Sequence, residues 1–281
     1  MHEWSLLIFT ICMQTAIGMV VLITLFQHKI NTYSENKKVN LLKLPLIIIT
    51  VLSIMGLAAS FTHLGTPTNA INTIINFRNS WMSNEIVITG IFIALIVIAL
   101  TLVFLQKKVN MNIILIASVV GLIDIFCMAK IYTTSLVDGW NNLNTYTSFY
   151  GTAFVLGAIF FATFVLPQTK NENKDLFQYL LKWTFIISII GVGIQLIGLA
   201  IFSMQEVNPL IIDATPWTQL IAPYMSTVFI RWIIEFIGVA MLGYLVLSSK
   251  GIKNTSIIYV VLLLLVGAEI MSRYVFYVIG A

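Results

Sequence analysis

Long apolar runs recur along the whole 281-residue chain, and they restrict its fold more than any other feature. A run of about 20 apolar residues is long enough to cross roughly 30 Å of hydrocarbon as an α-helix. The runs predict eight transmembrane helices, over residues 5–26, 43–62, 84–106, 111–132, 149–168, 178–203, 226–248 and 256–279. We therefore expect an all-α integral membrane protein, built as one domain over residues 1–281 and arranged as two four-helix bundles.

The composition agrees with a membrane protein and excludes several other classes. Charged residues make up 9% of the chain, against roughly 25% in an ordinary soluble domain. The first run follows Met1-His2-Glu3-Trp4 without the basic region or cleavage site of a signal peptide, so we expect it to be a retained helix. The net charge of +4 comes from scattered basic residues, which argues against a nucleic-acid partner.

The protein has few side groups that could ligate a metal. Cys12 and Cys127 both fall within apolar runs, so they predict neither a disulfide framework nor a zinc or iron–sulfur site. Of the three histidines, only His2 and His63 lie on one predicted side and could pair across a haem. We expect no haem, cluster or metal in this protein, and any redox metal should belong to a partner.

The positions of the basic residues predict the orientation of the helices. One set of alternate loops and helix ends carries eleven of the fifteen Lys and Arg residues, and the other carries four. The eleven are Lys29, Lys37, Lys38, Lys43, Lys107, Lys108, Lys170, Lys174, Lys182, Lys250 and Lys253. Because positive charge favours the cytoplasmic side, we expect both termini outside.

Ionisable residues inside the predicted spans are the candidates for function, because a charge in the bilayer is expensive. Two pairs have helical i,i+4 spacing, Arg231 with Glu235 and Glu269 with Arg273. We interpret both as structural ion pairs within one helix. Asp124 has no such partner, and we expect either a partner on another helix or a neutral, protonated carboxyl group.

His63 and Glu85 differ from these residues because both lie at the predicted outer boundary, on consecutive helices joined by one loop. A structural interpretation is available for both. Ser83 could cap the third span, with Glu85 as a favourable charge in its first turn and His63 as an interfacial polar residue. The spacing alone leaves this interpretation open beside a functional one.

Four short segments together form a pattern that extends from one end of the sequence to the other. They are His2-Glu3-Trp4 with Leu6 through Phe9-Thr10; His63-Leu64-Gly65 with Pro67, Ala70 and Asn72; Ser83-Asn84-Glu85-Ile86; and Glu269, Arg273 and Phe276-Tyr277. This pattern resembles the membrane anchor subunit of dimethyl sulfoxide reductase. It is concentrated in the first ninety residues and at the C-terminus.

The resemblance implies a function in anaerobic respiration, in the plasma membrane of a prokaryote. Members of that family oxidise menaquinol and pass electrons to a ferredoxin-like subunit with four iron–sulfur clusters, which supplies a molybdopterin catalytic subunit. The family positions that match His63 and Glu85 are associated with the quinol site, and Gln14 and Arg231 match family positions as well. No family role carries over to Asp124 or Glu235.

The chemistry of quinol oxidation suits the two boundary residues. A quinol loses two electrons and two protons, so its site needs a hydrogen-bond acceptor, a proton acceptor that titrates near neutrality and an exit to water. A neutral histidine such as His63 can provide the first two. A carboxylate at the boundary, such as Glu85, can provide the exit.

Two other functions remain open from the sequence. A passive anchor or assembly scaffold could keep the long outer loops without binding quinol. A small-solute transporter is disfavoured, because all six prolines lie in loops or at span ends rather than in the middle of a span. The terminal electron acceptor would bind to a partner subunit and is not encoded here.

Overall fold

The computed structural model describes residues 4–63, 77–135, 137, 139–169, 174–204, 219, 221–248 and 256–280, except for the side chain of His63. Within these ranges, eight helices are long and apolar enough to cross a membrane. They are α1 (Trp4–Leu25), α3 (Glu35–His63), α5 (Trp81–Leu105), α6 (Met111–Thr133), α7 (Leu143–Thr169), α8 (Lys174–Ser203), α10 (Met225–Leu247) and α11 (Ser256–Ile279). The predicted all-α membrane fold with eight spanning helices is therefore confirmed.

Several helices extend further than the sequence predicted. Helix α3 begins at Glu35 rather than near residue 43, after a short helix α2 (Gln27–Ile30) that was not expected. Its first turns are polar, and Lys38 forms an ion pair with Glu35 at 2.9 Å. Hydropathy locates the part of a helix that lipid can cover, whereas the hydrogen-bonded helix continues into the polar region wherever its side groups tolerate water.

The start of α5 differs from the start expected in the structural interpretation of Glu85, which had Ser83 as the cap and Glu85 in the first turn. The helix begins at Trp81, with Ser80 at the N-cap position and no hydrogen bond from the Ser80 hydroxyl. Ser83 lies inside the helix and is buried, so it is not the cap. Glu85 is consequently the fifth residue of α5, just beyond the first turn.

Helices α1 and α7 form the centre of the molecule. In each of these two helices, 78% of the apolar 18-residue stretch that could span the membrane is buried inside the protein. In α5 the corresponding share is 28%. Helices α1 and α7 are therefore enclosed, whereas α5 faces outward. Helix α1 packs against α3, α6, α7 and α11. Because α1 contacts helices from both halves of the sequence, the division into two separate four-helix bundles stays a prediction.

The crossing of α1 and α7 requires glycine. A Cβ atom added at Gly18 would overlap the carbonyl oxygen of Ala153, and one added at Gly157 would overlap the backbone of Gly18. Small residues allow membrane helices to approach at backbone distance. Gly18 and Gly157 therefore determine how closely the two central helices pack.

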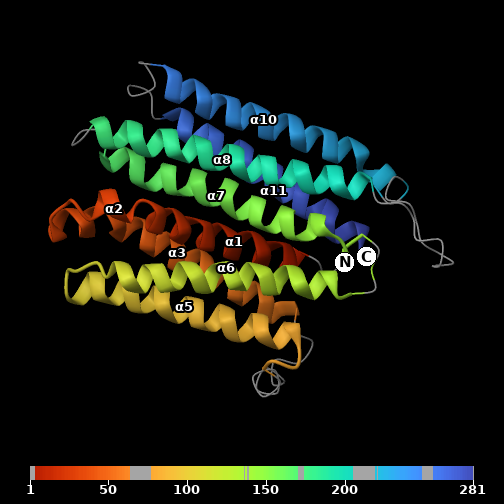
Figure 1. Cartoon of the computed structure of the whole chain (residues 1–281), viewed down its shortest axis with the longest axis horizontal. Helices are drawn as coiled ribbons and strands as arrows, with labels where there is room; N and C mark the ends of the chain where they lie inside the picture. Colours follow the sequence, from red (N-terminus) through yellow and green to blue (C-terminus); the bar gives the residue numbers. More distant parts are fainter. Residues whose placement is uncertain are drawn as a thin grey trace.

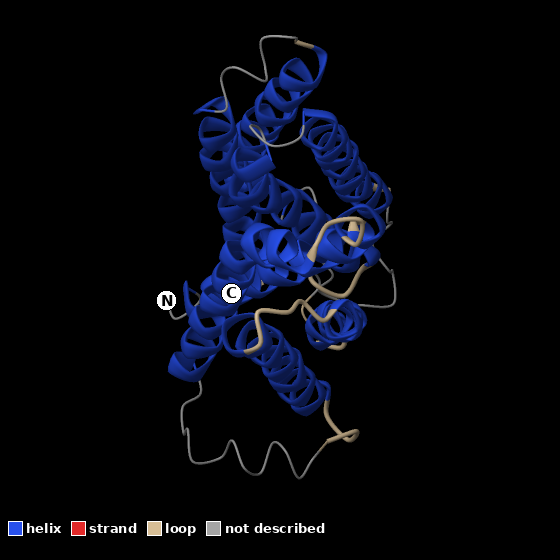
Figure 2. Ribbon diagram, turned by 90° about the vertical axis from the view of Figure 1, so that its left-hand side faces the viewer, coloured by secondary structure: helices blue, strands red, loops and turns tan. Residues whose placement is uncertain are grey.

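Both termini lie at the same end of the molecule (Figure 1), as an even number of crossings requires. Figure 2 views the helices along their length, and the described residues form only helices and loops in it. The assignment of the terminal end to the outer side still rests on the lysine count.

Candidate functional site

The α3–α5 end contains the two boundary residues singled out in the sequence. His63 is the last residue of α3, Glu85 lies near the start of α5, and the two helices pack against each other. Both positions therefore belong to the end of the molecule that carries the termini (Figure 1). The His63 side chain lies outside the described residues, so its contact with Glu85 stays a prediction.

Helix α5, which carries Glu85, packs against α6, which carries the buried Asp124. One turn beyond Glu85 on α5, the Thr89 hydroxyl donates to both Asp124 carboxylate oxygens, at 2.9 and 3.0 Å. Asp124 is fully buried, and it interacts electrostatically with Glu85. The partner of Asp124 is thus on another helix, one of the two outcomes expected from the sequence.

No cation compensates these two acids among the described residues. The ion pairs found there involve Lys38, Arg231 and their partners, and none reaches Glu85 or Asp124. An uncompensated carboxylate in hydrocarbon is costly, whereas the protonated acid is neutral. Glu85 and Asp124 are therefore suited to take up and release protons.

A pair of tyrosines connects this region to the C-terminal helix. The hydroxyl groups of Tyr132 on α6 and Tyr277 on α11 are 2.9 Å apart, and Tyr277 donates to the Thr10 hydroxyl on α1 at 3.3 Å. Polar contacts thus join α6 to α11 and α1 through Tyr132 and Tyr277.

A second polar group lies between helices α1, α7, α8, α10 and α11. Arg231 pairs with Glu235 at 2.8 Å, which confirms the expected ion pair, and lies 3.7 Å from Glu269. Arg231 also donates to the Gln195 amide, which in turn donates to Glu269 at 2.7 Å. Arg231, Glu235 and Glu269 are all buried.

The expected ion pair between Glu269 and Arg273 is not formed. Arg273 instead donates to Gln14 at 2.8 Å and to the Thr152 hydroxyl at 3.1 Å. Thr152 donates to Glu269 at 2.7 Å and so links the two residues. The i,i+4 spacing puts Glu269 and Arg273 on one face of α11. Arg273 nevertheless bonds to residues of α1 and α7 rather than to Glu269.

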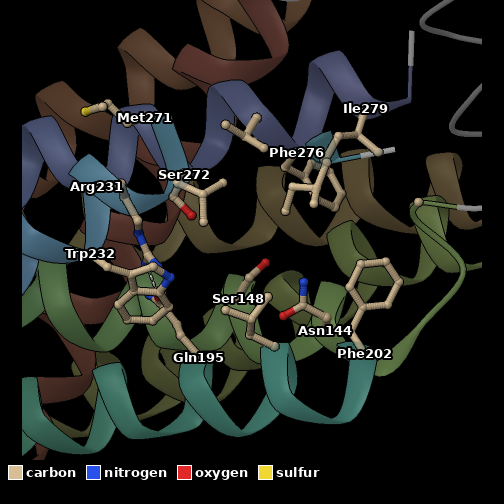
Figure 3. A pocket seen from close by; sticks show the side chains of 15 residues that line it. Asn144, Ser148, Gln195, Phe202, Arg231, Trp232, Met271, Ser272, Phe276 and Ile279 are labelled. Atoms are coloured by element: carbon tan, nitrogen blue, oxygen red, sulfur yellow. Dashed lines mark hydrogen bonds between the residues drawn. The ribbon is translucent and has the colours of Figure 1, made fainter. Parts of the chain in front are cut away.

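An open cavity, drawn in Figure 3, borders this group. It comprises about 700 Å³ of space between residues of α7, α8, α10 and α11, including the part open to the outside. Arg231, Trp232 and Gln195 meet on one side of it, and Phe202, Phe276 and Ile279 lie on the other. The Arg231 guanidinium stacks on Trp232, with its carbon 3.8 Å from the ring centre.

Gln14 and Arg231, which the resemblance adds to the residues expected to bind quinol, lie apart from Glu85 in the structure. Gln14 and Arg231 both belong to the second polar group, connected through Arg273, Thr152, Glu269 and Gln195. Helices α5 and α10, which carry Glu85 and Arg231, lie at opposite edges of the molecule (Figure 1).

Sequence reasoning missed two kinds of residue here. Gln195 stands alone in an apolar span, so it could have been singled out as Gln14 was. Thr89 and Thr152 gave no such signal, because threonine is common in membrane helices and usually bonds to its own backbone. Among the described residues, no group of three or more His, Cys, Asp or Glu residues could hold a metal ion.

Comparison with known proteins gives one consistent result. The family model described as DMSO reductase anchor subunit (DmsC) matches residues 1–279. A Haemophilus influenzae protein named as a subunit of anaerobic dimethyl sulfoxide reductase is 24% identical, over 99% of the present sequence and 94% of its own length. Two Escherichia coli proteins with the same enzyme in their names match over 98% of the present sequence and 94% of their own. One of them, YnfH, is 23% identical, and the other is 24% identical.

Proposed function

The protein belongs to the DMSO reductase anchor subunit family, and we propose that, as the membrane anchor of a DMSO reductase complex, it oxidises menaquinol and passes the electrons to an iron–sulfur subunit. The relatives named after anaerobic dimethyl sulfoxide reductase support membership of such a complex. The partners would be a ferredoxin-like subunit with four clusters and a molybdopterin catalytic subunit, together with the quinone pool of the membrane.

The pair of acids at Glu85 and Asp124 is the observation that supports a quinol site most directly. Oxidation of menaquinol gives menaquinone, two electrons and two protons. The electrons would leave to the partner's clusters, and the protons need acceptors at the site. His63 would accept the first proton, and Glu85, with Asp124 and Thr89 behind it, would pass protons to the water at the end of the bundle.

Paired substitutions at opposite ends of the molecule test this proposal. His63→Arg and Glu85→Gln should assemble with the partner subunits but abolish or strongly slow menaquinol-driven reduction of the partner's clusters, followed by absorbance. His28→Arg and Glu35→Gln are matched controls, because both residues are exposed near the lysine-rich end. Their turnover should equal that of the unmodified complex.

The outcome also separates quinol oxidation from a passive anchor. If His63→Arg and Glu85→Gln assemble and retain full quinol-driven turnover, the α3–α5 site plays no part in the reaction. A scaffold function would then be the better account. A transporter is less supported, since Pro45 and Pro167 lie within α3 and α7 without ending either helix.

We expect the partner to dock on the end that carries the termini, and quinol oxidation to be electroneutral. The α3–α5 site lies at that end, and an electron would otherwise have to cross roughly 30 Å of bilayer. Protons and electrons that leave on one side move no charge across the membrane. Proteoliposomes with a potential-sensitive dye should show no potential on turnover, and a potential that depends on quinol would refute docking at this end.

A further inference from the structure

We propose that a second cavity, where the start of α3 meets α7 and α8, binds the headgroup of an anionic phospholipid such as phosphatidylglycerol. It lies at the end of the molecule opposite the termini (Figure 1). The inference goes beyond the proposed function, because it concerns neither quinol nor the partner subunits. Three features carry it: the shape of the cavity, a lysine in its wall and an apolar face that continues from it along α3.

The cavity is polar at its mouth and closed on its inner side. It comprises about 580 Å³ of empty space, including the part open to the outside. The residues that line it come from three helices: Lys37, Asn40 and Leu41 of α3, Gln168 and Thr169 of α7, and Leu176 of α8. Leu41, Thr169 and Leu176 are buried, whereas Lys37 and Asn40 are exposed. A small polar group can therefore enter from the membrane surface and rest on an enclosed inner wall.

Lys37 brings a positive charge to this cavity. Its ammonium nitrogen lies over the ring of Tyr33, 6.0 Å from the ring centre. In the part of the chain that the structure describes, the ion pairs involve Lys38 and Arg231 but not Lys37, and the lining contains no Asp or Glu. The phosphate of a lipid would supply the missing negative charge and accept hydrogen bonds from the Lys37 ammonium and the Asn40 amide.

A second lysine adds positive charge beside the cavity. Lys29 of α2 lies over the ring of Tyr179 of α8, 5.3 Å from its centre, and Tyr179 is one helical turn beyond Leu176. Of the acids described at this end, Glu35 is already in an ion pair and Asp175 does not line the cavity. Basic pockets between membrane helices on the cytoplasmic side bind anionic lipid headgroups, and the lysine count predicts that this end is cytoplasmic.

An apolar face of α3 favours a lipid over a free anion. Leu44, Val51 and Met55 are exposed, and they follow Lys37 at intervals of seven, seven and four residues. These intervals put all four residues on one face of the helix. The acyl chains of a lipid whose phosphate meets Lys37 would lie along this face, whereas inorganic phosphate would gain nothing from it.

The test uses the intact complex in nanodiscs that contain a phosphatidylglycerol analogue with a photoreactive diazirine in its headgroup. Mass spectrometry identifies the labelled peptides, and saturable labelling is expected at the end of α7 around Gln168 and Thr169. Lys37→Gln should raise the half-saturating fraction of the analogue by about fivefold, the usual contribution of one lysine near an anionic lipid. Asn40→Trp, which fills the cavity from α3, should abolish the labelling.

Each variant has a matched control. Lys43→Gln removes the same charge from the same helix, but Lys43 lies over the Phe104 ring of α5, 4.7 Å from its centre, and does not line the cavity. Gln178→Trp adds the same bulk at an exposed position of α8 outside the cavity. Both controls should label as the unmodified complex does. Thermal unfolding of all four variants verifies that the helices remain folded.

Three results would overturn the proposal. Equal labelling by a phosphatidylcholine analogue with the same diazirine would show that the cavity does not select negative charge. A shift in Lys43→Gln as large as that in Lys37→Gln would mean that the lysine-rich end attracts anionic lipid without a defined site. Displacement of the analogue by millimolar inorganic phosphate would assign the cavity to a free anion instead of a lipid.

Discussion

Two groups of polar residues on the membrane helices of this protein differ in how their charges are compensated. Glu85 and Asp124, the acid pair, have a threonine and electrostatic neighbours but no cation within ion-pair distance among the described residues. Arg231, Glu235, Glu269 and Arg273, the balanced group, combine two cations with two acids and are linked by Gln14, Thr152 and Gln195. Both groups lie within membrane helices.

The difference indicates what each group can do. Removing one member of the balanced group leaves an opposite charge without compensation, so its charges are coupled to the folded structure. Within the described part of the chain the acid pair has no counter-ion to lose, and each of its members can become neutral by taking up a proton. We therefore associate the balanced group with stability and the acid pair with proton transfer.

The largest effect is expected from breaking the balanced group. Glu269→Ala and Arg273→Ala should each destabilise the protein by about 3–5 kcal/mol, as expected when one partner of a buried charged pair is removed. The measurement is SDS-induced unfolding in detergent micelles, together with the yield of folded protein. Asp175→Ala, which removes an exposed acid on α8, is the control and should change little.

Full stability with lost turnover would contradict this prediction. It would move Glu269 and Arg273 into the quinol reaction and remove the functional distinction between the two groups.

A smaller effect is expected at the crossing of α1 and α7, where Gly18 lies against the backbone of α7. Gly18→Val should destabilise the protein by about 1–3 kcal/mol, the usual result of overpacking, because a side group there meets the α7 backbone at Ala153. Gln14 lies one turn from Gly18, so its bond to Arg273 should be lost as α1 moves away. Gly90→Val is the matched control on α5, where an added Cβ atom meets nothing within 4 Å. Equal losses of stability in both variants would show that the effect comes from replacing glycine in a helix and not from the α1–α7 crossing.

The sequence predicted the eight spans because each must be apolar over about 20 residues, a property of the local sequence. It predicted the Arg231–Glu235 pair for the same reason, since i,i+4 spacing is local. The Glu269–Arg273 prediction was wrong because spacing does not reveal competing partners on other helices. The bond between Thr89 and Asp124 joins residues 35 apart on separate helices, and no local pattern predicts it.

The smallest effect is expected from neutralising the acid pair. Asp124→Asn keeps an oxygen that can accept the Thr89 hydroxyl and removes only the possible charge, so its stability should stay within about 1 kcal/mol of the unmodified protein. Glu269→Gln makes the equivalent change in the balanced group, but it leaves the Arg231 and Arg273 charges in excess and should cost several times more. SDS-induced unfolding of the two variants in parallel measures the difference directly. If Asp124→Asn loses as much stability as Glu269→Gln, Asp124 must be compensated by a cation outside the described residues. The acid pair would then be a second balanced group, and its assignment to proton transfer would lose its physical basis.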